Sequence, residues 1–210
     1  MDSSSNFIRW CGIAAVVGGI VYLSLGLLGR LYIYLYSPSD PSGVPPILNF
    51  VERIFPILLL FGAAAAIAGL HRIQRRRYGL TGALASLMAF VGVVLLLVGS
   101  AVEAVAGPAF EPSLLFLISG LFLATLGLAG LGVLTILARV LPWWVGAALI
   151  LGSPPFVLLL PTILEGLLIP YETLHPLLAG VAWALVGYGL FRIAAHAGPR
   201  QPARGGFRDR

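Results

Sequence analysis

Six long apolar runs constrain this chain more than any other feature of its sequence. A helix that crosses a bilayer needs about 20 mostly apolar residues, and each run reaches that length. Because lipid offers no partners for backbone N–H and C=O groups, such segments fold as helices. We therefore predict an all-α, polytopic membrane protein whose single domain, residues 1–196, is a six-transmembrane-helix bundle. The predicted spans are residues 10–36, 50–71, 79–102, 113–138, 143–166 and 174–195.

The composition agrees with a membrane protein. Charged residues make up 10% of the 210 residues and hydrophobic residues 59%, whereas soluble domains carry about 25% charged residues. The single cysteine, Cys11, excludes an intramolecular disulfide, and the lack of lysine excludes lysine Schiff-base chemistry. The first run is longer than the apolar region of a signal peptide, so we expect it to stay as a permanent span.

The placement of arginine predicts the orientation of the bundle. Eleven of the thirteen basic residues fall on one side of the predicted spans, and only Arg30 and Arg53 fall on the other. The positive-inside rule then places both the N- and C-termini in the cytoplasm of a multi-pass cell-membrane protein. The turn "HRIQRRRYG" (71–79) either sets this topology alone or also contacts anionic lipid at the inner face. The basic tail, 197–210, is predicted to be disordered, and no nucleic acid is expected as a partner.

Two stretches of the chain resemble each other and indicate a hairpin repeat. "AIAGLHRIQRRRYGLTGALASL" (66–87) and "GLAGLGVLTILARVLPWWVGAALIL" (127–151) share an AGL near a helix end, an arginine-bearing turn, and a next helix that opens on Gly-Ala. The alternative is convergence of Gly/Ala-rich helices. In both cases the small residues predict helix–helix contacts, because they let backbones approach closely in lipid. "GIAAVVGGI" (12–20) and "FGAAAAIAGL" (61–70) are the densest such faces.

The fifth span interrupts itself in "ILGSPPFVLLLPTILEGLLIPYETLHP" (150–176). Pro154 and Pro155 lack an N–H and should free the carbonyls near Ile150 and Leu151. Non-helical backbone within a membrane is tolerated where protein buries it or where it lines a cavity, and transporters place binding sites at such breaks. We weigh two interpretations: a packing kink in which Ser153 satisfies a freed carbonyl, and a break that lines a pocket.

Ionisable residues gather near the predicted outer ends of the helices. An ionisable residue inside a membrane is a functional-site hypothesis by default, and Arg30 is the deepest of them. The alternative is a structural salt-bridge cluster. The residues of this candidate ligand site, with those of the helix break, are Arg30, Glu52, Arg53, Glu103, Ser153, Pro154, Pro155, Glu165, Glu172 and His175.

Metal and catalytic signatures are weak or missing. "ETLH" (172–175) places a carboxylate and an imidazole three residues apart, a spacing used in metal sites of helical bundles. Weak candidate metal ligands are therefore Glu103, Glu165, Glu172 and His175. The chain contains no GxSxG, HExxH, Walker A or GxGxxG motif, and no cofactor is indicated.

The predicted architecture is similar to that of the substrate-capture subunits of vitamin transporters, with six spans, internal termini and a basic inner face. No binding motif accompanies this resemblance. The leading hypothesis is a protein that binds, or binds and transports, a small molecule or ion through a polar pocket near the outer leaflet. The first alternative is a non-catalytic accessory subunit or interaction protein of a larger membrane complex. The second is a membrane enzyme that uses outer-leaflet carboxylates. The bundle is also a candidate for a homodimer formed through a Gly/Ala-rich face.

Overall fold

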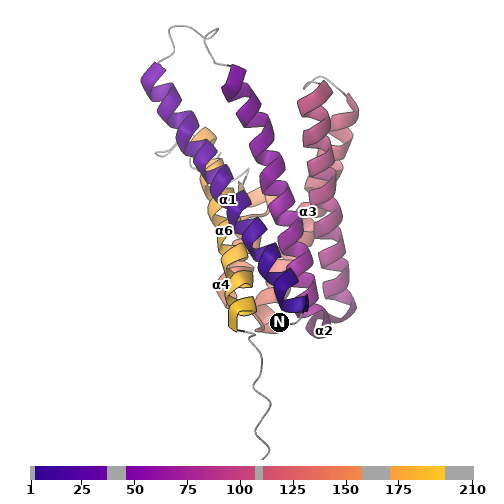
Figure 1. Cartoon of the computed structure of the whole chain (residues 1–210). Coiled ribbons are helices and arrows are strands. Elements are labelled where there is room, and N and C mark those ends of the chain that lie inside the picture. The colour runs from indigo at the N-terminus through magenta and orange to yellow at the C-terminus, as the bar shows by residue number, and fades with distance from the viewer. Residues whose placement is uncertain (1–2, 37–45, 107–110, 158–170, 197–210) are drawn as a thin grey trace, which may run out of the picture.

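The computed structural model describes residues 3–36, 46–106, 111–157 and 171–196, and within these ranges the chain is helical and contains no strand. The elements run up and down beside one another (Figure 1). They are α1 (Ser3–Tyr36), α2 (Pro46–Ala106), α3 (Glu111–Ala138), α4 (Trp143–Leu151) and α6 (Tyr171–His196). The all-α prediction is therefore confirmed for the described residues.

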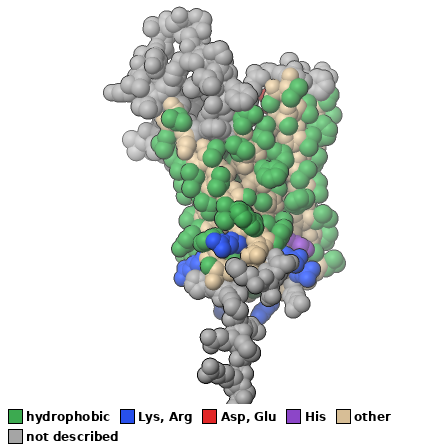
Figure 2. Space-filling view, viewed as in Figure 1, with side chains coloured by type: hydrophobic (Ala, Val, Ile, Leu, Met, Phe, Trp, Pro, Cys, Tyr) green, Lys and Arg blue, Asp and Glu red, His purple; other side chains and the backbone are tan. Residues whose placement is uncertain are grey.

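Five described stretches are long and apolar enough to cross a membrane. They are Ser5–Ser24, Pro56–Arg75, Arg77–Val105, Pro112–Ala138 and Leu174–Ala195. The face seen in Figure 2 is largely hydrophobic, and many large apolar side chains of the described helices are exposed, as lipid requires and water would not favour. The chain is thus a multi-pass helical membrane protein. Of the remaining expected span, 143–166, only the part up to residue 157 is described.

Helix α2 consists of two arms that fold back on each other at Gly79. The backbone of Gly79 has φ 61° and ψ −153°, a conformation that is open essentially to glycine alone. We call residues 46–78 the first arm and residues 80–106 the second arm. The turn "HRIQRRRYG" thus ends at the residue that reverses the chain, which makes the two arms a helical hairpin.

Helices α1 and α6 pack antiparallel through paired glycines, which we call the glycine seam. A Cβ added to Gly12 would lie 2.8 Å from the carbonyl oxygen of Gly187, and one added to Gly187 would lie 2.6 Å from that of Gly12. Gly19 and Gly180 form a second pair of the same kind, with distances of 2.5 and 2.6 Å. Since lipid is as apolar as leucine, helices in membranes depend on this close backbone approach for association.

Close approach at glycine recurs between α2 and α3 and between α3 and α4, and the helix contacts together close a ring. The second arm of α2 packs on α3, where a Cβ on Gly92 would lie 2.2 Å from the backbone nitrogen of Ala124. Helix α3 packs on α4 through Gly132 and Gly146. Helix α4 contacts α6, which returns to α1. The glycine-rich faces expected to mediate helix contacts therefore do so within one chain.

The described arginines gather at one end of the bundle, which we call the arginine-rich end (Figure 2). Four segments meet at this end: the first residues of α1, the turn of α2, the α3–α4 turn and the end of α6. Arg9 and Arg72 stack over the rings of Phe191 and Phe7, at 5.5 and 5.7 Å. Their aliphatic and guanidinium groups thereby cover apolar helix ends while their charge stays at the surface.

Candidate functional site

The helix interruption lies directly after α4. The helix ends at Leu151, and the next helical turn begins at Pro154. The Ile150 carbonyl accepts hydrogen bonds from the Ser153 hydroxyl at 2.6 Å and from the Ser153 N–H at 3.1 Å. Ser153 therefore satisfies the carbonyl that Pro154, having no N–H, leaves without its usual partner. Leu151 likewise loses its helical donor, because Pro155 stands four residues on.

A cavity of about 180 Å³ lies inside the ring of helices, beside this interruption. Helices α1, α2, α3 and α6 and the broken segment that follows α4 contribute to its wall. The lining residues are Tyr22, Pro56, Leu59, Leu60, Ala63, Val93, Leu96, Ser100, Leu121, Ala124, Leu128, Gly152, Pro154, Val157, His175, Ala179 and Trp183. An apolar cavity of about 150 Å³ in another protein holds a benzene molecule, so this one is large enough for a single ring.

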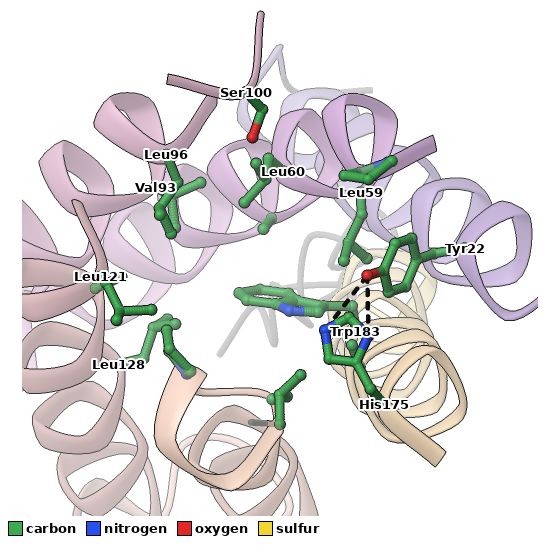
Figure 3. A pocket seen from close by; sticks show the side chains of 17 residues that line it. Tyr22, Leu59, Leu60, Val93, Leu96, Ser100, Leu121, Leu128, His175 and Trp183 are labelled. Carbon is green, nitrogen blue, oxygen red and sulfur yellow. Dashed lines mark hydrogen bonds between the residues drawn. The ribbon is translucent and has the colours of Figure 1, made fainter. Parts of the chain in front are cut away.

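Tyr22 of α1 and His175 of α6 face each other across one side of the cavity (Figure 3). The Tyr22 hydroxyl lies 3.3 Å from Nδ1 and 3.5 Å from Nε2 of His175. The two rings meet edge to face, with centroids 5.7 Å apart and planes at 77°. These contacts are at the long limit of a hydrogen bond, so the pair presents an O–H and an imidazole edge to the cavity without a tight mutual bond.

Trp183 extends its indole into the middle of the cavity (Figure 3). Its side chain is 4% exposed, and its Nε1 faces Gly152, where an added Cβ would lie 3.4 Å away. The indole N–H is a donor only, and a buried tryptophan usually finds an acceptor. The structure places this donor between the cavity and the backbone of the helix interruption.

The described wall of the cavity carries no arginine, aspartate or glutamate. Its polar groups are the hydroxyls of Tyr22 and Ser100, the imidazole of His175 and the indole N–H of Trp183. Transferring an uncompensated charge into such surroundings is costly. The described wall is therefore mostly apolar and offers a few hydrogen-bonding groups.

The predicted site residues are distributed unevenly around this cavity. Pro154 and His175 line it, and Ser153 lies next to Pro154 but turns its hydroxyl to Ile150. Neither Pro155 nor the half-buried Glu103 is among the lining residues. Five other predicted side chains lie outside the described part of the structure: Arg30, Glu52, Arg53, Glu165 and Glu172.

The structure gives no support to a metal centre among the described side chains. No three histidine, cysteine, aspartate or glutamate residues come together within the described ranges. Of the four weak candidates, the structure describes the side chains of Glu103 and His175. The side chains of Glu165 and Glu172 are not among those it describes. The predicted metal site therefore stays a prediction.

Sequence reasoning missed three polar members of the cavity wall, namely Tyr22, Ser100 and Trp183. A signal for Trp183 was present: it lies in the middle of a predicted span, whereas tryptophan in membrane helices is enriched at the interfaces. Tyr22, in mid-span of the first apolar run, is a similar exception. Their convergence on one cavity depends on how α1 and α6 pack, which periodicity does not show.

Comparison with known proteins adds no relative. No protein family, curated protein or solved structure matches the chain. The candidate site therefore stands on its geometry.

Proposed function

We propose that this protein binds a small, neutral, ring-sized molecule in the central cavity. The observation that carries the proposal is a cavity of about 180 Å³ that is walled by α1, α2, α3, α6 and the interrupted segment. Ligand sites typically combine a mostly apolar wall with a few convergent polar groups. Tyr22, His175 and Trp183 supply such groups here.

The interrupted helix supports binding rather than a purely mechanical kink. Ser153 satisfies the Ile150 carbonyl, so this carbonyl needs no ligand. Gly152 and Pro154 nevertheless face the cavity, and non-helical backbone at membrane depth is tolerated where it lines one. The same segment thus forms the kink and part of the cavity wall. Transport would require that the bound molecule also leave this site toward the other side of the membrane.

Two other functions have less support. A homodimer or an accessory role through the face "GIAAVVGGI" competes with contacts inside the chain, because Gly12 and Gly19 already pack against α6 and Gly18 against α2. An enzyme using outer carboxylates would depend on Glu52, Glu165 and Glu172, whose side chains lie outside the described part of the structure.

We further propose six spans with both termini in the cytoplasm. The described arginines gather at one end of the bundle, which agrees with the positive-inside rule if that end is cytoplasmic. A hairpin repeat is supported by the two turns at this end, since each contains a residue with positive φ, Gly79 at 61° and Arg139 at 51°.

Filling the cavity tests the binding proposal. Leu60→Trp adds bulk to a half-buried side chain of the wall, whereas Leu58→Trp makes the same change at a side chain that is 44% exposed on the outer surface. We expect native mass spectrometry of the wild type to show one bound small molecule per chain. Leu60→Trp should reduce its occupancy by about tenfold, an effect of about 1.4 kcal/mol.

Leu58→Trp should retain the molecule and serves as the control for expression and detergent extraction. If ligand is lost during purification, thermal stabilisation by millimolar indole provides the second readout, and only Leu60→Trp should abolish it. A wild type that neither retains a molecule nor responds to indole, or equal behaviour of the two variants, would argue against the cavity as a binding site.

A further inference from the structure

A second hollow lies between the two arms of α2, near the arginine-rich end, and we call it the hairpin groove. Its volume is about 400 Å³. His71 and Ser86 line it together with Ile67, Leu87 and Phe90. Leu87 is 58% exposed and Phe90 39%, so the groove is bordered by side chains on the lipid-facing surface. It shares no lining residue with the central cavity.

Two polar atoms at the groove are buried and have no partner within the described structure: Nδ1 of His71 and Oγ of Ser86. Ser86 is only 3% exposed. Other hydroxyls of the bundle bond to a nearby carbonyl of their own chain segment, as Ser24 does to Ile20 and Thr135 does to Leu131. A buried hydroxyl without such a bond is costly, and its place in the groove wall indicates an external partner.

The polar part of the groove lies at the depth of the membrane interface. His71 precedes Gly79 by eight residues and Ser86 follows it by seven, so the two face each other at one level of the hairpin. Arg72, on the first arm next to His71, stacks on Phe7 of the neighbouring helix α1. An added Cβ on Gly69 would lie 2.9 Å from Cβ of Cys11. Trp10, 69% exposed, therefore marks the interface at this level.

The groove is apolar toward the membrane and positive toward its edge. Ile67, His71 and Arg75 follow one another at intervals of four residues, so they lie along one face of the first arm. Phe90 stands four residues beyond Ser86, which places it one turn deeper in the membrane. From its edge toward the membrane interior, the groove thus presents a cation, then hydrogen-bonding groups, then an apolar wall. This order matches that of an anionic lipid, whose charged headgroup is followed by its acyl chain.

We propose that the hairpin groove binds one anionic phospholipid of the leaflet at the arginine-rich end. The phosphate accepts hydrogen bonds from the Ser86 hydroxyl and from His71 in its Nδ1–H tautomer. Arg75 supplies positive charge at the edge, and an acyl chain packs against Leu87 and Phe90. Such a site would satisfy the two polar atoms of the groove wall that have no partner among the described residues.

Native mass spectrometry with defined lipids tests this proposal. Delipidated protein is titrated with phosphatidylglycerol and, separately, with phosphatidylcholine. We expect a single phosphatidylglycerol adduct per chain that Ser86→Ala and Arg75→Gln each weaken by about fivefold. Arg77→Gln is the matched control, because it removes the same charge from an exposed arginine two residues on, on another face of the helix.

Thermal stability separates lipid binding from a structural role of Ser86. Ser86→Ala removes an unsatisfied hydroxyl, so the lipid-free variant should be as stable as the wild type or more stable, while its stabilisation by phosphatidylglycerol should fall. Equal binding of both lipids would overturn the anionic preference. Scattered adducts unchanged in Ser86→Ala and Arg75→Gln, or equal losses in Arg77→Gln, would overturn the site.

Discussion

Two tyrosines buried in this bundle lie in very different surroundings. Tyr78, near the arginine-rich end, has its hydroxyl 3.0 Å from Oγ1 of Thr135. That Oγ1 also lies 2.7 Å from the Leu131 carbonyl and 3.2 Å from Oε1 of Gln74. Tyr22 contacts His175 at 3.3 and 3.5 Å beside the central cavity. The first hydroxyl belongs to a close-packed cluster, and the second borders open space.

The difference separates polar groups that hold the fold from polar groups that can bind a ligand. Gln74 and Thr135 are 0% exposed, and a buried polar group without partners destabilises a protein by about 1–3 kcal/mol. The Tyr78 cluster is thus part of the packing between α2 and α3. The Tyr22–His175 pair lines the cavity and its mutual contacts are long, so a bound molecule can compete with these contacts.

The largest effect is expected where neither side chains nor cavities can adjust, in the glycine seam. Gly19→Ala places a Cβ 2.5 Å from the Gly180 carbonyl oxygen, so the backbones of α1 and α6 must separate. We expect the free energy of unfolding to fall by about 3 kcal/mol, measured by denaturant titration in mild detergent. Because this seam positions both Tyr22 and His175, ligand binding should be lost with it.

Gly130→Ala is the matched control for that substitution. Its nearest neighbour would be Cβ of Ala85 at 3.5 Å, an ordinary contact. Within a helix, alanine is favoured over glycine by about 1 kcal/mol, so Gly130→Ala should be neutral or stabilising. Similar losses in the two variants would show that close backbone approach is not what the seam requires.

An intermediate effect is expected in the Tyr78 cluster. Thr135→Val keeps the shape of the side chain but removes the hydroxyl that Tyr78 and Gln74 share, and should lower the free energy of unfolding by about 2 kcal/mol. Thr135→Ser keeps the hydroxyl and should lose less. Occupancy of the central cavity, measured by native mass spectrometry, should be the same in Thr135→Val as in the wild type. If Thr135→Val is as stable as the wild type, the hydroxyl cluster around Tyr78 does not hold the fold, and the proposed difference between Tyr78 and Tyr22 is wrong.

The smallest effect on stability is expected at the cavity. Tyr22→Phe removes a hydroxyl whose contacts with His175 are long, and should change the free energy of unfolding by less than about 1 kcal/mol. If the pair binds a ligand, the same substitution should reduce occupancy of the cavity by about fivefold. A large loss of stability without any change in occupancy would place Tyr22 with Tyr78, as a structural group.

The apolar runs alone determined that the chain is a multi-pass helical protein, because only helices satisfy their own backbone in lipid. The sequence also located the helix interruption at Pro154 and Pro155, since proline has no N–H wherever it occurs. It indicated the gathering of arginines at one end and the glycine faces of helix contacts.

Tertiary structure alone decided which residues meet. Gly12 could have packed against any neighbour, and its pairing with Gly187 rests on the antiparallel approach of α1 and α6. That approach brings Tyr22 beside His175 from 153 positions away, and it places Trp183 over the break at Gly152. Periodicity describes one helix at a time, whereas a cavity is the space that several packed helices leave unfilled, so the sequence predicted the helices and only their packing defined the site.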